Sequence, residues 1–291
     1  MTSDSYTRRV HHVMDHVRRN LAGDLSLETL ARQAHFSPFH FHRIFKVVAG
    51  ETVAQYTRRC RLERAAYLMM AAPSRMLGSI ALEVGFSSQS DLSRSFRREY
   101  GLPPSTWDRK TALHGQPIPQ PLPGVEISAD APPQAVVRRH PACRLAYVRV
   151  REPFVTDALQ QGYQVLVEWL EQRGVAWRDL QVLGLSWDNY ETTPLHKVRF
   201  DIGFVVSSPL QPDGEVGIQS LPAVEAVDVH VDGSLPLIAQ AWDYLYEQWL
   251  PRSRYEPDDM PGIKRFRVRP DVLQWSRWNV DCSIAIRPLR P

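Results

Sequence analysis

The stretches ARQAHF (residues 31–36) and ALEVGF (residues 81–86) form the clearest internal repeat of the chain and decide its N-terminal fold. The similarity continues downstream, where an aromatic residue and a glycine recur at an offset of 51 residues: Phe45 and Phe96, then Gly50 and Gly101. Each copy reads as a short helix, a turn, and a second helix that ends at a glycine. We therefore predict two helix-turn-helix motifs, at about residues 25–50 and 76–101. The alternative is a generic helical bundle with two similar helix pairs.

Turn and cap residues support the two motifs. Serines stand where helix N-caps are expected, namely Ser26, Ser37, and either Ser87 or Ser88. Pro38 suits the first helical position. In the turn, Gly85 adopts positive φ without a steric penalty, whereas His35 at the same place of the first copy is tolerated less well.

A long helical pattern joins the two copies, VAQYTRRCRLERAAYLMM at residues 53–70. Its apolar stripe contains Leu62, Ala65, Ala66 and Met69, and other positions hold a cluster of arginines: Arg58, Arg59, Arg61 and Arg64. A further amphipathic pattern at residues 6–20 precedes the first motif. The whole region is therefore expected to be helical.

The segment GQPIPQPLPG, residues 115–124, contains four prolines, which remove backbone donors and fix φ. It predicts a short, semi-rigid linker. Patterns before it are helical, and β-branched alternating runs appear after it. We therefore expect a multidomain protein, with an all-α domain at residues 1–114 and an α+β domain at residues 125–291.

Charge is distributed unevenly between these halves. Residues 1–115 contain 17 Lys and Arg against 10 Asp and Glu, a net charge of +7, whereas the remainder has a net charge of −4. A basic N-terminal half favours a nucleic-acid partner.

The second helix of each predicted motif is the candidate for DNA recognition, because a helix-turn-helix places it in the major groove. Arginine pairs with guanine, glutamine with adenine, and an apolar side chain contacts the thymine methyl group. The candidate residues are Phe39, His40, His42, Arg43 and Lys46 in the first copy, and Gln89, Ser90, Ser93 and Arg94 in the second. Basic residues further along are expected to contact phosphates without reading sequence, mainly Arg97 and Arg98.

The region from Leu25 to Lys110 resembles the AraC/XylS family of transcription regulators. The resemblance is carried by LSLETLARQAHFSPFHFHRIFK (residues 25–46), the long helix, and IALEVGFSSQSDLSRSFRREYGLPPSTWDR (residues 80–109). One departure is Trp107-Asp108-Arg109, where the family has Tyr-Arg. The resemblance implies two groove-reading helices, with Phe39, His42 and Arg43 at base-contacting positions of the first and Gln89, Ser90, Ser93 and Arg94 on the second.

A more diverged repeat follows the linker, with an offset of 80 residues between Trp169 and Trp249 and between Asp201 and Asp281. Each copy predicts the order strand, helix, strand, strand. The first copy comprises strands at 135–139 and 145–150, a helix at 157–173, and strands at 180–185 and 198–206. The second comprises a strand region at 216–230, a helix at 235–249, and strands at 263–269 and 280–287.

Two such units side by side are expected to leave a groove between their sheets. An aromatic groove with few polar groups suits a flat or amphipathic organic molecule. The candidate ligand-binding residues are Tyr147, Trp187, Trp242, Tyr246, Lys264, Phe266 and Trp275. The alternative is that these aromatic residues belong to an ordinary core.

The second half resembles the GyrI-like effector-binding domain, and the order of the two domains resembles the Rob-type regulators. The segments that carry this are KVRFD (197–201), LPAVEAVDVHVDG (221–233), AWDYLYEQWLPRS (241–253) and DCSIAIRPL (281–289). The family commonly has a ligand-facing glutamate where this chain has Lys264. By the sign of its charge, Lys264 favours an anionic or neutral ligand. Two alternatives are that its side chain extends to solvent and that the domain binds nothing.

Composition narrows the class of protein. Hydrophobic residues make up 43% and charged residues 23%, as in ordinary globular proteins. No apolar run reaches the roughly 18 residues of a membrane span, and the first twenty residues are too polar for a signal peptide. The three cysteines lie far apart, so reduced thiols in a cytoplasmic protein are expected. No metal-ligand spacing and no cofactor motif is present, so neither is expected.

These observations predict a cytoplasmic transcription regulator that binds double-stranded DNA and is not an enzyme. Its C-terminal domain is expected to sense a small effector or to contact a partner such as RNA polymerase. One alternative is a module that binds gyrase or RNA polymerase without a ligand. Another is a small-molecule hydrolase, for which His140 and His230 are the nearest candidates, although a lone histidine in a strand is more often structural.

Overall fold

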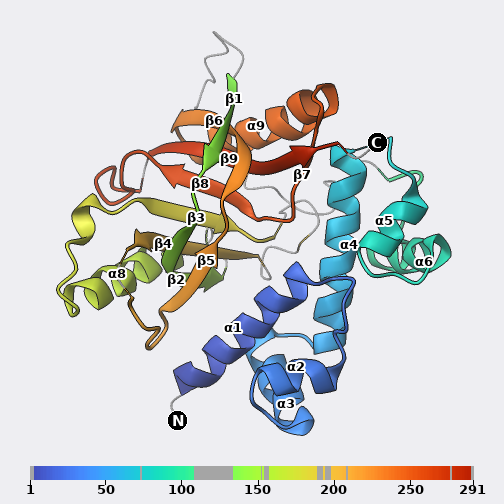
Figure 1. The fold of residues 1–291 in the computed structure, drawn as a ribbon, viewed down its shortest axis with the longest axis horizontal. Helices are drawn as coiled ribbons and strands as arrows, with labels where there is room; N and C mark the ends of the chain where they lie inside the picture. Colours follow the sequence, from blue (N-terminus) through green and yellow to red (C-terminus); the bar gives the residue numbers. More distant parts are fainter. Residues whose placement is uncertain are drawn as a thin grey trace. The chain divides into compact units, whose positions relative to one another are not determined.

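The computed structural model describes residues 3–72, 74–107, 134–151, 153, 157–188, 193, 198–207, 209–275 and 277–289. The chain divides into two compact units, Met1–His114 and Gly115–Pro291 (Figure 1). The predicted linker at 115–124 lies outside the described residues. The described part of the first unit is helical and that of the second is strand-rich, which confirms the expected multidomain layout in outline.

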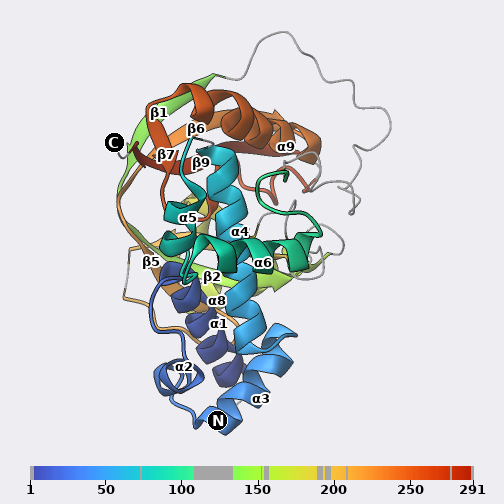
Figure 2. The ribbon, with the colours of Figure 1, turned by 90° about the vertical axis from the view of Figure 1, so that its right-hand side faces the viewer.

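Six helices form the described part of the first unit: α1 (Ser3–Arg19), α2 (Leu27–Gln33), α3 (Pro38–Ala49), α4 (Val53–Ala71), α5 (Leu77–Glu83) and α6 (Gln89–Tyr100). The long helix α4 connects two helix pairs, α2–α3 and α5–α6 (Figures 1 and 2). The first pair packs with α1 against the beginning of α4, and the second pair packs against its later turns. One helix therefore positions both pairs.

The helix ends follow the local sequence signals. At the starts of four helices, a side-chain oxygen of the N-cap residue accepts a hydrogen bond from a backbone N–H; these N-caps are Ser26, Ser37, Thr52 and Ser88. Of the two serines that the sequence left open, Ser88 is therefore the N-cap. The turn residues His35 and Gly85 have φ of 56° and 87°, as the left-handed turn position of each pair requires.

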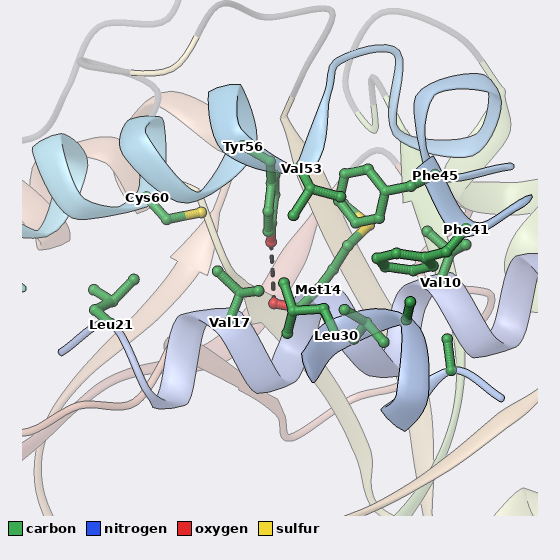
Figure 3. Packing of buried hydrophobic residues seen from close by; sticks show 13 residues of the cluster. Val10, Met14, Val17, Leu21, Leu30, Phe41, Phe45, Val53, Tyr56 and Cys60 are labelled. Atoms are coloured by element: carbon green, nitrogen blue, oxygen red, sulfur yellow. Dashed lines mark hydrogen bonds between the residues drawn. The ribbon is translucent and has the colours of Figure 1, made fainter. Parts of the chain in front are cut away.

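Two apolar clusters hold this unit together. In the first, buried side chains of α1 face α3 and α4, with Phe41, Phe45 and Tyr56 fully enclosed (Figure 3). The Tyr56 hydroxyl donates to the Met14 carbonyl oxygen at 3.2 Å. The second cluster joins Leu62, Ala65 and Ala66 of α4 to α5, α6 and Trp107. Each helix pair thus has a core of its own, and both cores share α4.

Arg59 is buried, contrary to its expected place among the arginines outside the apolar stripe. Its guanidinium binds Glu51 at 2.5 Å and Glu63 at 2.6 Å, and Glu63 also binds Arg18 of α1 at 3.2 Å. Because these charges are shielded from water and satisfied by one another, the network fixes α1 and the residues before α4 to one face of α4.

The described strands of the second unit are β1 (Ala135–His140), β2 (Cys143–Arg151), β3 (Val182–Ser186), β4 (Arg199–Val206), β5 (Gly217–Leu221), β6 (Val224–Gly233), β7 (Tyr255–Pro257), β8 (Gly262–Phe266) and β9 (Trp278–Pro288). They form one antiparallel sheet in the order β1-β6-β9-β8-β3-β4-β2-β5, with β7 beside β9. The helical elements are α8 (Ala158–Glu171), η1 (Trp177–Asp179), α9 (Leu235–Asp243), the π-helical η3 (Tyr244–Trp249) and η4 (Leu250–Arg252).

The expectation of two separate sheets with a groove between them is wrong for the described strands. β3 pairs with β8, and this joins the strands of both copies into one sheet. The predicted strand region at 216–230 is also divided, because β5 ends before Pro222, which has no N–H to donate to a ladder. The predicted helix at 235–249 is helical over its whole length, as α9 followed directly by the π-helical η3.

Helices α8 and α9 lie on the same face of this sheet. A Cβ built on Gly162 of α8 would lie 2.8 Å from Val150 and 3.3 Å from Val148. The ring of Trp242 in α9 lies 3.1 Å from the corresponding point on Gly262. Ladder partners share a face of the sheet. Strand pairing connects the strand under α8 to the strands under α9 through one row of ladder partners: Val148, Ile202, Gly184, Lys264, Cys282 and Val229. We call the face with this row the helix-covered face.

Candidate nucleic-acid interface and candidate effector site

The second helices of the two pairs each have a buried side and an exposed side. On α3, Phe41 and Phe45 are buried, and on α6, Leu92 and Phe96 are buried. The exposed residues include nearly all DNA-binding candidates: Phe39, His40, His42, Arg43, Lys46, Gln89, Ser90, Arg94, Arg97 and Arg98. Ser93 is half-buried. The structure therefore places the candidates of each helix on a surface that solvent reaches.

Local contacts organise the beginning of α3. The hydroxyl of Ser37 caps the helix and lies 3.2 Å from Nδ1 of His40. The guanidinium of Arg43 lies over the ring of Phe39, 5.7 Å from its centroid. Phe39 itself is 67% exposed. These contacts direct an aromatic ring and a guanidinium outward from the same turns.

The cationic candidates have no carboxylate partner among the described residues. Arg43, Lys46, Arg94, Arg97 and Arg98 form no ion pair there, whereas Arg59 and Arg75 are each paired. Their charges therefore remain available for phosphates or base edges.

The seven ligand-binding candidates of the second unit do not lie together. Lys264 and Phe266 extend from β8 on the helix-covered face, and Trp242 of α9 covers that face above Gly262. Tyr246 stacks on Trp242, with ring centroids 6.3 Å apart, and Trp275 packs against Tyr163 of α8 at 5.3 Å. Tyr147 belongs to the neighbouring register row, and its side chain therefore extends from the opposite face.

On that opposite face, Tyr147 and Trp187 surround a buried ion pair. Arg149 donates to both carboxylate oxygens of Asp201, at 2.7 and 2.8 Å. Trp187 Nε1 donates to the same carboxylate at 2.5 Å, and Gln219 does so at 3.3 Å. The guanidinium of Arg149 lies 5.7 Å from the ring centroids of both Tyr147 and Trp187. These contacts give the two aromatic residues a place in this ion-pair cluster, apart from Lys264.

Lys264 occupies the centre of the helix-covered face and is 1% exposed. Its Nζ donates to Ser186 Oγ at 2.9 Å and lies 5.0 Å from the ring centroid of Phe200 and 5.5 Å from that of Trp242. Burial lowers the pKa of Lys264 to about 8. The alternative that this side chain extends to solvent is therefore wrong.

Three residues around Lys264 were not among the sequence candidates: Ser186, Phe200 and Gly184. A Cβ on Gly184 would lie 2.2 Å from the ring of Phe200, so the glycine lets this ring from β4 lie over the backbone of β3. A glycine inside an apolar strand is a recognised signal of such an approach. The LGLS run at 183–186 carried that signal.

The two histidines proposed for a hydrolase are each bound to an aspartate. His140 Nε2 lies 3.0 Å from Asp228, and His230 Nδ1 lies 3.2 Å from Asp281. None of the three cysteines forms a disulfide bond, and Cys60 and Cys282 are buried. In the described part of the chain, no group of three or more His, Cys, Asp and Glu side chains is arranged to hold a metal ion. No described helix is both long and apolar enough to span a bilayer.

Comparison with known proteins agrees with the division of the chain into a helical unit and a strand-rich unit. Residues 30–110 match the model of a helix-turn-helix domain, and residues 133–286 match that of a GyrI-like small molecule binding domain. The multiple antibiotic resistance protein MarA of Salmonella typhimurium is 31% identical over 107 residues, which are 37% of this chain and 83% of MarA. The transcriptional regulator Rob of the same species is 32% identical over 98 residues, 34% of each chain.

The uncharacterized HTH-type transcriptional regulator YbfP of Bacillus subtilis is 34% identical over 102 residues, 35% of this chain and 34% of YbfP. The matched region thus spans about a third of YbfP and of Rob, and most of MarA. The helix-turn-helix region precedes the GyrI-like domain, in the order that the Rob-type resemblance predicts. This chain belongs to the AraC family of helix-turn-helix transcriptional regulators and carries a GyrI-like domain.

Proposed function

We propose that this protein is a sequence-specific transcriptional regulator that reads two successive major grooves of DNA with α3 and α6. The observation that carries the proposal is the pair of exposed faces on these helices, with Arg43 and Arg94 at equivalent positions and without carboxylate partners among the described residues. Membership in the AraC family supports it.

The dimensions of α4 support reading by both helices of one chain. Its 19 residues give a length of about 28 Å, comparable with the roughly 34 Å of one DNA turn. The buried pairs of Arg59 with Glu51 and Glu63 stiffen its first turns. A rigid spacer of this length suits two helices that enter neighbouring grooves on one side of a duplex.

Changing Arg43 or Arg94 to alanine should weaken binding to the specific operator by about 1–3 kcal/mol each, because a bidentate contact to guanine is lost. Binding to unrelated DNA should change much less. The operator is first obtained from a genome-wide occupancy map of the tagged protein. Titrations of labelled operator and scrambled duplex, at one fixed salt concentration, then measure both affinities.

Arg97→Ala provides the matched control, since we propose that Arg97 contacts phosphate. This variant should lose affinity equally on both duplexes. The slope of its log affinity against log salt concentration should become smaller in magnitude by about one, since one fewer counterion is released. Equal losses on operator and scrambled DNA for Arg43→Ala and Arg94→Ala would overturn the base-reading roles of these arginines.

We also propose that the C-terminal domain senses a small amphipathic or aromatic molecule. The description of its family as small molecule binding and the aromatic surroundings of Lys264 support this role. Contact with RNA polymerase or gyrase is the alternative, and co-purification with the full chain, with and without its operator, tests it.

A role in regulating transcription also implies that the protein acts in the cytoplasm and is not an enzyme.

A further inference from the structure

Lys264 is placed where a lysine is least expected. It is the one charged member of the register row Val148, Ile202, Gly184, Lys264, Cys282 and Val229, on the face that α8 and α9 cover. A buried ammonium is destabilising unless other groups compensate for its lost hydration. The contacts of Lys264 therefore indicate what it is suited to bind.

Two aromatic rings and one hydroxyl surround its Nζ. Phe200 reaches the sheet above Gly184, and Trp242 does so above Gly262, where a Cβ would lie 3.1 Å from the indole. Both rings present their faces to Nζ, at 5.0 and 5.5 Å, and such faces attract a cation. Ser186 Oγ accepts one hydrogen bond from Nζ. These contacts offset part of the lost hydration of the ammonium and leave two of its three donors for other acceptors.

The described residues provide no anion for this charge. Asp228 and Asp281 lie on β6 and β9, but their register rows extend from the opposite face, where they bind His140, His230 and Arg267. Cys282 is the ladder partner of Lys264, and burial raises the pKa of its thiol to about 12, so this sulfur is neutral at pH 7. The positive charge on this face is therefore uncompensated by the described side chains.

We propose that the C-terminal domain takes a planar aromatic carboxylate as its effector, with the carboxylate bound by Lys264 Nζ and Ser186 Oγ and the ring held against Trp242. The proposal rests on the sensor function proposed above. A carboxylate accepts the free donors of the ammonium in a charge-assisted hydrogen bond. Trp242 is half-buried, stacks on Tyr246 and has its ring centroid 5.5 Å from Nζ, so a ring held against it would lie close to the ammonium. A cationic molecule would instead meet the positive charge of Lys264.

Three probes of the same shape and different charge test this proposal: benzoate, benzamide and benzamidine. Calorimetric titration of the full chain at pH 7 should show benzoate binding at least tenfold more tightly than benzamide, and benzamidine binding most weakly. Lys264→Met should remove this preference, and Ser186→Ala should weaken benzoate binding several-fold. Arg138→Met removes a half-exposed cation from β1 on the opposite face and should leave benzoate binding unchanged.

The pH dependence gives a second readout that needs no variant. Benzoate affinity should fall as the pH rises from 7 to 9, because the ammonium loses its proton, while benzamide affinity should stay constant. Benzamide or benzamidine binding as tightly as benzoate would overturn the proposal, as would benzoate affinity that Lys264→Met or pH leaves unchanged, or no benzoate binding at all. DNA titrations without any probe test the regulator function separately, so failure of one proposal is distinguishable from failure of the other.

Discussion

Replacing Lys264 with methionine should increase the free energy of unfolding of the C-terminal domain by about 3 kcal/mol at pH 7. Burial lowers the pKa of Lys264 from 10.5 to about 8, and each pKa unit corresponds to about 1.4 kcal/mol. Methionine has a similar length, adapts to irregular packing and needs no hydration. Seven of the eight tryptophans lie beyond residue 124, so urea unfolding followed by tryptophan fluorescence reports mainly on this domain.

The stability that Lys264→Met gains over the wild type should decrease as the pH rises. Below pH 8, Lys264 is protonated in both the folded and the unfolded chain, so the full destabilisation is present. Between pH 8 and 10.5, the folded chain releases the proton while the unfolded chain keeps it, and the stability of the wild type rises with pH. Above pH 10.5 both forms are neutral. The advantage of Lys264→Met should therefore shrink towards zero across this interval.

Arg138→Met is the control for this experiment, because Arg138 is half-exposed in the same sheet. Its effect should stay within about 0.5 kcal/mol and should not change between pH 8 and 10.5. A loss of stability in Lys264→Met at pH 7, or a gain that is constant with pH, would contradict the account of Lys264 as a buried ammonium. A residue that lowers stability at a buried position is more readily explained by binding than by folding.

The helical unit was predictable from the sequence because its signals are local. The long helix was expected at 53–70 and is Val53–Ala71, and Ser37 caps α3 as expected. Caps, turns and amphipathic spacing each depend on residues within a few positions of one another. The burial of Arg59 was not predictable, because it depends on Glu51 and Glu63 meeting the same guanidinium in three dimensions.

The strand-rich unit was predictable only element by element. A strand was expected at 198–206 and β4 is Arg199–Val206. The pairing of β3 with β8 brings together residues about 80 positions apart, and no local pattern specifies it. Because side chains alternate along a strand, that pairing also decides which residues share a face. The sequence therefore grouped Tyr147 and Trp187 with Lys264, whereas the register separates them, and it missed Ser186 and Phe200.

Changing Gly85 to alanine should destabilise the helical unit by about 3 kcal/mol. Gly85 has φ of +87°, a conformation that costs an L-residue about 1–2 kcal/mol. Its Cβ would also lie 2.2 Å from the Leu21 carbonyl oxygen and 2.9 Å from Arg61 Nε, and overpacking of this kind costs about 1–3 kcal/mol. Urea unfolding followed by far-ultraviolet circular dichroism measures the change, since the described part of this unit consists mainly of helices.

His35 occupies the equivalent turn of the first pair with φ of +56°, and it makes His35→Gly a matched control. Glycine removes the left-handed penalty but increases the freedom of the unfolded chain, so stability should change by less than about 1 kcal/mol. The contrast isolates the clash at Leu21, where Arg61 Nε donates to the same carbonyl oxygen at 2.9 Å. If Gly85→Ala also changed stability by less than 1 kcal/mol, the second turn would not be held against the end of α1. Helices α3 and α6 would then lack the rigid connection that the proposed reading of two successive grooves requires.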